Sequence, residues 1–175
     1  TSNIAIGRAA MTGGTGDLTG CIAIGVECLD NTVGNDQTGT IAIGHQALTA
    51  LTSGDGNTAI GYQAMDAEVA GSFSTAVGYN ALGAQTGTSG DVGSTAVGYE
   101  AGRALTTGTR NTVMGSYALY SEDVGQYSVA IGSHALYSQN TASLGATGNT
   151  AVGYQAGYAT VTGTNNTAVG YESLV

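Results

Sequence analysis

Residues that could do chemistry are sparse in this chain, and they do not form a catalytic set. The two histidines, His45 and His134, lie one and two places after a repeated glycine, in different copies of a repeat, and no nucleophile recurs beside them. A general base must lie within hydrogen-bond reach of the group whose proton it takes. We therefore interpret both histidines as surface residues, and the sequence predicts that the protein is not an enzyme.

Acidic residues lie either two places after a repeated glycine (Glu27, Glu100 and Glu172) or in variable turns. The turn residues are Asp17, Asp30, Asp36, Asp55, Asp66, Asp91 and Asp123. Segments 13–17 and 53–57 resemble calcium-binding turns only weakly, because they lack the acidic ligand spacing that a hard cation needs. Solvated turn residues are the favoured interpretation. No metal or cofactor is expected, and calcium is the one cation that the pattern suggests.

Aromatic and sulfur side chains also recur at fixed places. A tyrosine follows the repeated glycine in five copies, as Tyr62, Tyr79, Tyr99, Tyr154 and Tyr171. In stacked copies these rings would form a ladder at the strand spacing, which could bind the faces of sugars or pack between chains. Packing is favoured. Cys21 and Cys28 fill places held elsewhere by small residues, so we interpret them as small-residue substitutes and not as a disulfide.

All of these residues belong to one repeat, for which residues 57–65 (NTAIGYQAM) are the pattern. Its ten cores are 3–11, 21–29, 40–48, 57–65, 74–82, 94–102, 111–119, 128–136, 149–157 and 166–174. Each contains one glycine after an apolar residue: Gly7, Gly25, Gly44, Gly61, Gly78, Gly98, Gly115, Gly132, Gly153 and Gly170. The glycines are 17 to 21 residues apart, a period typical of stacked repeats. Residues 1–175 are therefore predicted to form a single solenoid domain.

The residues before each glycine read as a short strand. The position just before it is Ile6, Ile24, Ile43, Ile60, Val77, Val97, Met114, Ile131, Val152 or Val169. Alternate residues of a strand share a face, so this row and the Thr or β-branched row two places earlier point the same way. We predict that they form the core ladder. The intervening row should then face outward: Ala5, Ala23, Ala42, Ala59, Ala76, Ala96, Ala130, Ala151 and Ala168.

The rest of each copy completes a narrow coil. The glycine suits a corner that needs an unusual φ or a close approach of the next coil. A second short strand should carry apolar pairs such as Ala64–Met65 inward, and a Gly- and Asn-rich turn should close the coil. The sequence thus predicts an all-β parallel β-roll of about ten coils of 17–21 residues, spaced ~4.8 Å apart and stabilised by their neighbours.

Composition limits the partners. The formal net charge is −9, with no lysine and three arginines, so nucleic acid and anionic membranes should be repelled. No apolar run reaches the ~18 residues of a membrane-spanning helix. The chain begins at Thr1 without a basic and apolar leader, so we expect either a removed leader or a piece of a longer protein.

The alanine row suggests contact with other chains. It is uncharged and continuous, and monomers rarely expose such a strip. We predict that it packs against the same strip of sister chains, most simply around a threefold axis. A flat, solvated alanine face is the alternative.

The pattern small–Thr/Val–Ala–Ile/Val–Gly–x–x–Ala resembles the head repeats of trimeric autotransporter adhesins, and residues 128–135 (SVAIGSHA) match it at nearly every position. Still closer is the Asn-Thr-Ala-Val-Gly-Tyr-Gln-Ala-Leu repeat of many phage tail-fibre proteins. The resemblance covers essentially the whole chain. It implies a left-handed β-roll with three chains side by side, in an extracellular fibre on a virion or cell. The coils are longer than those of the adhesin heads.

These observations favour a shaft or head segment of a trimeric fibre used for attachment, with a cell-surface glycan or protein as receptor. The longest turns, 84–93 and 137–148, are the predicted contact points. Two alternatives remain. A β-solenoid with a regular Thr row could bind ice, although Ile4, Ile22, Ile41 and Val129 in that row suggest burial. A filament could form by end-to-end stacking, since the chain starts and ends on repeat cores.

Overall fold

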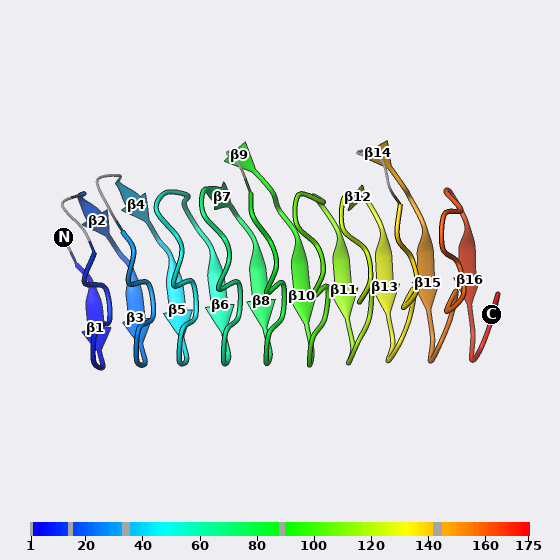
Figure 1. The fold of residues 1–175 in the computed structure, drawn as a ribbon, viewed down its shortest axis with the longest axis horizontal. Coiled ribbons are helices and arrows are strands. Elements are labelled where there is room, and N and C mark those ends of the chain that lie inside the picture. Colours follow the sequence, from blue (N-terminus) through cyan, green and yellow to red (C-terminus); the bar gives the residue numbers. More distant parts are fainter. Residues whose placement is uncertain (1, 14–15, 33–35, 88–89, 142–144) are drawn as a thin grey trace.

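The computed structural model describes residues 2–13, 16–32, 36–87, 90–141 and 145–175. Within these ranges the chain contains strands and turns and no helix. Ten three-residue strands form one sheet that runs the length of a rod (Figure 1). They are β1 (Ile4–Ile6), β3 (Ile22–Ile24), β5 (Ile41–Ile43), β6 (Thr58–Ile60), β8 (Thr75–Val77), β10 (Thr95–Val97), β11 (Thr112–Met114), β13 (Val129–Ile131), β15 (Thr150–Val152) and β16 (Thr167–Val169).

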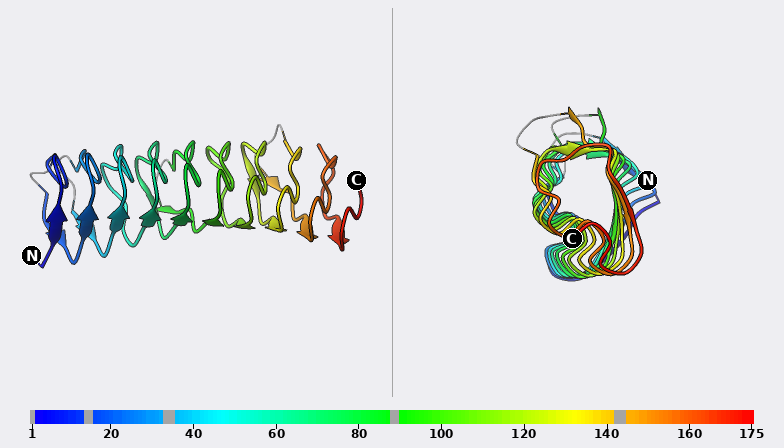
Figure 2. Two further views of the ribbon diagram at one scale, coloured as in Figure 1. Left: turned by 90° about the horizontal axis from the view of Figure 1, so that it is seen from below. Right: turned by 90° about the vertical axis from the view of Figure 1, so that its right-hand side faces the viewer.

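All ten strands are parallel and in register. Ala76 pairs with Ala59 on one side and with Ala96 on the other, so equivalent residues of successive coils lie next to each other. Viewed along the rod, the coils superimpose as one closed loop (Figure 2). The predicted parallel β-solenoid is therefore confirmed.

Six two-residue strands lie at the far end of the coils. They are β2 (Leu18–Thr19), β4 (Gln37–Thr38), β7 (Gly71–Ser72), β9 (Gly90–Asp91), β12 (Gly125–Gln126) and β14 (Gly145–Ala146). They pair only locally, as β2–β4, β7–β9 and β12–β14. Strands β9 and β14 project beyond the other coils (Figure 1). Both belong to the longest turns, which this end of the rod therefore presents.

The predicted core ladder is wrong, because the two faces of the strands are exchanged. The alanines of the middle row are buried from β3 to β16, and only Ala5 in β1 is exposed. The row just before the glycine points outward and is exposed or half-buried: Ile6, Ile24, Ile43, Ile60, Val77, Val97, Met114, Ile131, Val152 and Val169. The alanine row, Ala23 to Ala168, is therefore part of the core and cannot be the strip between chains.

The width of the coil explains this exchange. The turn after each glycine carries two side chains into the interior, and the second is a leucine or methionine such as Leu82 or Met65, both fully buried. Opposite these large side chains only a methyl group fits. One coil confirms the argument: where Gly102 replaces the leucine, Val113 replaces the alanine, and a Cβ on Gly102 would lie 3.8 Å from Val113 Cγ2. The interior volume is kept.

The second strand predicted after the corner is also wrong. Residues two and four places after the glycine, such as Gln63 and Met65, have φ near +51°, so this segment is a tight turn. A left-handed residue reverses the side-chain direction that a strand would give, and Ala64 and Met65 both enter the core. Inward packing of the apolar pair was predicted correctly, but the backbone that achieves it was not.

Corner glycines are required for both of the predicted reasons. All ten have φ between +125° and +142°, outside the regions that residues with a Cβ adopt. At Gly78, an added Cβ would overlap the carbonyl oxygen of Gly98 in the next coil. The glycine column therefore allows the coils to stack closely at this corner.

Candidate functional site

The predicted tyrosine ladder forms, and it is longer than predicted. Tyr62, Tyr79 and Tyr99 stack on one another with ring centroids 5.1 and 5.2 Å apart and planes within 13°. His45 continues the stack at one end, at 5.3 Å. Where the next two coils lack a tyrosine after the glycine, Tyr117 and His134, one place later, fill the gap. The complete aromatic row is His45, Tyr62, Tyr79, Tyr99, Tyr117, His134, Tyr154 and Tyr171.

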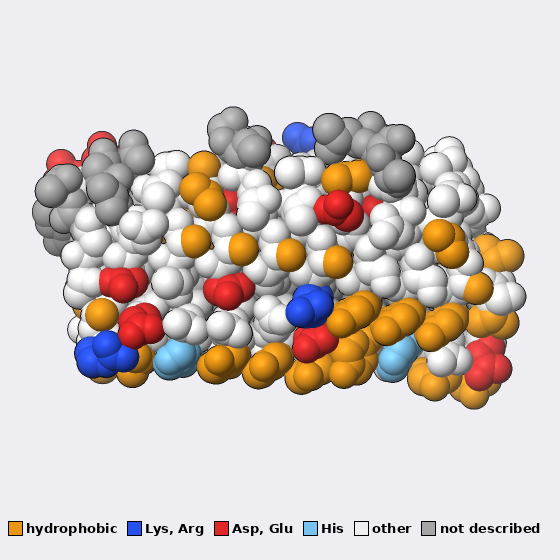
Figure 3. All heavy atoms as spheres, in the orientation of Figure 1, with side chains coloured by type: hydrophobic (Ala, Val, Ile, Leu, Met, Phe, Trp, Pro, Cys, Tyr) orange, Lys and Arg blue, Asp and Glu red, His pale blue; other side chains and the backbone are white. Residues whose placement is uncertain are grey.

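The geometry of this row limits what it can bind. Parallel stacking uses the ring faces of Tyr62, Tyr79 and Tyr99 for each other, so their edges and hydroxyls face outward. A sugar stacks on a ring face, whereas a protein surface can pack against ring edges. The row is thus an exposed apolar ridge, and hydrophobic side chains gather along this edge of the rod (Figure 3). Its geometry favours packing over a sugar platform.

A hydrogen bond within the row raises the pKa of Tyr99 to about 12. The main cause is the side-chain hydrogen bond with Tyr117, and burial and the nearby Glu100 carboxylate act in the same direction. The neutral phenol of Tyr99 is therefore the favoured form well above the ordinary range of tyrosine.

A second stack was not predicted. Tyr120, Tyr137 and Tyr158 lie five places after their glycines and stack at 5.2 and 5.1 Å with planes 3° apart. Their fixed position within three successive repeats was a signal that could have found them. The two histidines lie in different coils: His45 stacks on Tyr62, and His134 contacts Tyr117 and Tyr137.

The acidic residues singled out from the sequence mostly bond the neighbouring coil. Asp55 Oδ1 accepts the backbone N–H of Thr38 at 2.7 Å, and Asp36 Oδ1 accepts that of Asp17 at 2.9 Å. Glu27 pairs with Arg8 at 2.7 Å, and this hydrogen bond holds the pKa of Glu27 below its ordinary value. Among the described residues, no three His, Cys, Asp or Glu side chains form a group that could hold a metal ion. Residues 14–15 of the first candidate calcium turn lie outside the described residues.

Both cysteines are free thiols and buried, as expected of small-residue substitutes. Burial raises the pKa of the Cys28 thiol. The two long turns predicted as contact points are described only in part, because residues 88–89 and 142–144 lie outside the described ranges. Within those ranges they include β9 and β14.

Two buried glutamates were missed by the sequence analysis. Glu68 is fully buried, and its Oε1 accepts three successive backbone N–H groups, from Val69, Ala70 and Gly71, at 2.7 to 3.1 Å. Its Oε2 accepts from Gln85 Nε2 at 2.9 Å. A buried carboxylate needs such donors because it has lost its hydration.

Glu122 repeats this arrangement 54 residues later. It accepts the N–H groups of Asp123, Val124 and Gly125 at 2.8 to 3.3 Å, and Gln139 Nε2 donates to it at 2.7 Å.

The two glutamates reveal a longer repeat of three coils. The interior position seven places after the glycine holds Leu51, Glu68 and Gln85 in one unit and Leu105, Glu122 and Gln139 in the next. Each pair is 54 residues apart. The glycine spacings contained this signal, since steps of 17, 17 and 20 residues are followed by 17, 17 and 21. The sequence analysis assigned the longer steps to loops alone.

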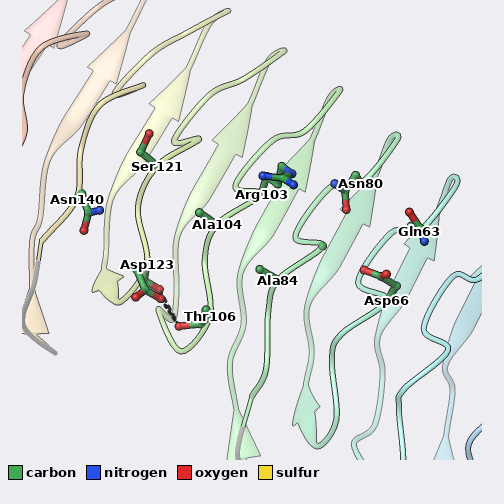
Figure 4. Close-up of a pocket in the computed structure, with 11 residues that line it drawn as sticks. Gln63, Asp66, Asn80, Ala84, Arg103, Ala104, Thr106, Ser121, Asp123 and Asn140 are labelled. Carbon is green, nitrogen blue, oxygen red and sulfur yellow. Dashed lines mark hydrogen bonds between the residues drawn. The ribbon is translucent and has the colours of Figure 1, made fainter.

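The outer surface of the first unit is hollowed into an open groove of about 640 Å3 (Figure 4). Asp66 and Asn80 lie on one side, and Arg103 and Asp123 on the other, with Ala84 between them. Burial raises the pKa of Asp66, although the backbone N–H groups of Asp66 and Ala67 bond its carboxylate. Such a volume is within the range of small-molecule sites, roughly 300–1,000 Å3.

Comparisons with protein-family models, curated proteins and solved structures gave no match. In the described part of the chain, no helix could span a membrane.

Proposed function

We propose that this chain is a shaft or head segment of an extracellular attachment fibre, on a virion or a cell, in which three identical chains pack side by side. The supporting observation is the outward face of the ten-stranded sheet, here called the strand face. It consists of the first and third residues of every strand, which are Ile, Val, Thr or Met and never charged. Several are well exposed, such as Ile6 at 59% and Met114 at 48%.

This assignment replaces the alanine row by the strand face as the contact between chains. Burial of exposed β-branched side chains is favourable at about 25 cal/mol per Å2. Identical rods with one apolar face associate most simply around a closed symmetry axis parallel to their length. The threefold axis and left-handed winding come from the resemblance to the adhesin and tail-fibre repeats and stay predictions.

The size of the strand face requires a second surface. Ten strands ~4.8 Å apart, with three residues of ~3.3 Å each, cover roughly 450 Å2. Stable interfaces bury about 800 Å2 on each partner. The aromatic row begins two residues after the last outward strand residue, and Tyr62, Tyr79 and Tyr99 are each more than 40% exposed. We infer that this row joins the strand face in the contact.

Sedimentation velocity tests the assembly. The 17.2 kDa chain should sediment with the mass of a trimer. Replacing Val77 and Val97 by glutamate should give monomers, because charges would be buried in the contact. Gln126→Glu adds a charge on β12, away from the strand face, and should leave the trimer intact. A wild-type monomer at all concentrations would refute the side-by-side assembly.

One observation favours an ice-binding surface as a second candidate. The Thr row was expected to be buried, but it faces outward, and Thr58, Thr75, Thr95 and Thr112 follow one another in adjacent coils. A purified sample would decide. A freezing gap that disappears in Thr75→Lys and Thr95→Lys would support ice binding, and the absence of a gap would reject it.

A further inference from the structure

A gap in one line of side chains creates the groove. The position five places after the corner glycine is occupied in successive coils by Asp66, Gly83, Arg103 and then the stacked Tyr120 and Tyr137. At Gly83 this line has no side chain. An added Cβ there would overlap Oδ1 of Asn80, which lies over the glycine. Asp66 and Arg103 are therefore separated by a coil that presents only an amide.

Arg103 is held in place from two sides. Its Nε lies 4.0 Å from Glu100 Oε2, and its guanidinium lies 5.7 Å from the Tyr120 ring centre. One of its Nη1 hydrogens points to Tyr120 Oη at 3.4 Å. A guanidinium has five N–H donors, so these partners fix the group without using its capacity. A side chain that is ordered before binding loses less entropy when a ligand arrives.

The opposite side of the groove supplies acceptors. Asp66 forms no ion pair with Arg103, and its carboxylate is anchored by backbone N–H groups of its own turn. Asn80 adds a carbonyl and an amide between the two charges (Figure 4). Donors and acceptors thus face one small space, above a floor of Gly83, Ala84 and Ala104 that leaves room for a ligand.

Comparison of the two three-coil units shows that the groove belongs to the surface and not to the core. Their buried residues match, as Glu68 and Glu122 do. The line that reads Asp66, Gly83, Arg103 in the first unit reads Tyr120, Tyr137, Tyr158 in the second. The same coils therefore carry a polar groove in one place and a closed aromatic stack in the other.

The chemistry of the groove selects its ligand. An anion would meet the carboxylates of Asp66 and Asp123, and a chain of net charge −9 repels polyanions. An apolar ligand would leave Arg103, Asn80 and Asp66 without partners. Vicinal hydroxyls, which donate and accept at once, match a carboxylate, an amide and a guanidinium together. We propose that this groove binds a neutral, hydroxyl-rich carbohydrate chain lying along the rod.

This inference rests on the proposed attachment function and names the class of receptor. It places binding in the groove and not on the faces of the aromatic row or on the long turns. Because the groove is open, the affinity should be modest, with a Kd of roughly 0.1–5 mM.

Saturation-transfer NMR tests the site with neutral hexasaccharides of glucose, mannose and N-acetylglucosamine, and with hexagalacturonate as an anionic probe. At least one neutral probe should receive saturation, and Asp66→Asn and Arg103→Gln should each weaken its binding at least fivefold. Asp30→Asn is the matched control, because Asp30 occupies the same place in a coil outside the groove. Thermal unfolding should confirm that all three variants are folded.

Saturation of no neutral probe, tighter binding of hexagalacturonate, or equal loss in Asp30→Asn would each overturn the inference. Sedimentation of the same samples separates it from the proposed function. A trimer without sugar binding refutes only the groove, whereas a monomer that binds sugar refutes only the assembly.

Discussion

Single residues fix this fold where the backbone leaves the ordinary conformations of L-amino acids. At the corner, glycine is needed for two independent reasons, its φ and the carbonyl of the next coil. Two and four places later, Gln63 and Met65 adopt left-handed conformations that only the surrounding packing can maintain.

We expect Gly78→Ala to lower the free energy of unfolding by at least about 3 kcal/mol, because it adds backbone strain and a clash with Gly98. Gly39→Ala is the control, since Gly39 has φ +68° and open space around its Cα, so about 1 kcal/mol is expected. Urea unfolding measures both. Equal losses would show that the close stacking at the corner is unimportant.

Tyr99 predicts a loss of stability in alkali. Its pKa is near 10 when unfolded and about 12 when folded, so the folded state holds the proton more tightly. The contribution is therefore complete below pH 10 and is lost between pH 10 and 12. Tyr99→Phe should flatten the fall in unfolding midpoint across this window, and alkaline titration of the tyrosines by ultraviolet absorbance should lose its highest step. An unchanged titration would contradict the assignment.

At the scale of the strand, the two faces differ in the space available to a side chain. The inward alanine meets a leucine from the opposite turn, as the exchange of Gly102 and Val113 shows. The outward valine meets solvent or a sister chain.

The same new side chain should therefore have opposite consequences at neighbouring positions. Ala96→Leu should destabilise by roughly 1–3 kcal/mol or more because the core is overpacked. Val97→Leu should change stability by less than about 1 kcal/mol. Thermal unfolding of the two variants provides the comparison. A larger loss in Val97→Leu would restore the core ladder predicted from the sequence.

At the scale of the whole molecule, the rod is a sum of coils, each stabilised by its neighbours. The pattern Leu, Glu, Gln at the interior position adds a longer register of three coils. Any shortening must preserve both periods.

Deletion of residues 51–104 joins Ala50 to Leu105, which stands where Leu51 stood. We expect this chain to fold, with the same circular dichroism per residue and a lower unfolding midpoint. Deletion of 51–95 breaks the register and should prevent folding. If both deletions behave alike, the three-coil unit has no structural role.

The sequence by itself determined the coil. Ten glycines at fixed spacing, each after a strand of the same pattern, allow only one register in which equivalent residues meet, and the parallel stack follows. The turn and its closing glycine could be predicted for the same reason. The tyrosine row could be predicted as well, because its members share one place in the repeat.

Only the tertiary structure decided which face of the strand is inside. Alternation distinguishes two faces of a strand but does not say which is buried, and β-branched residues suit a strand on either side. The width of the coil settles the matter, since leucines from the turn fill the interior and leave room for alanine alone. The groove has the same origin: Asp66, Gly83 and Arg103 are far apart in the chain and become neighbours only because successive coils lie one strand spacing apart.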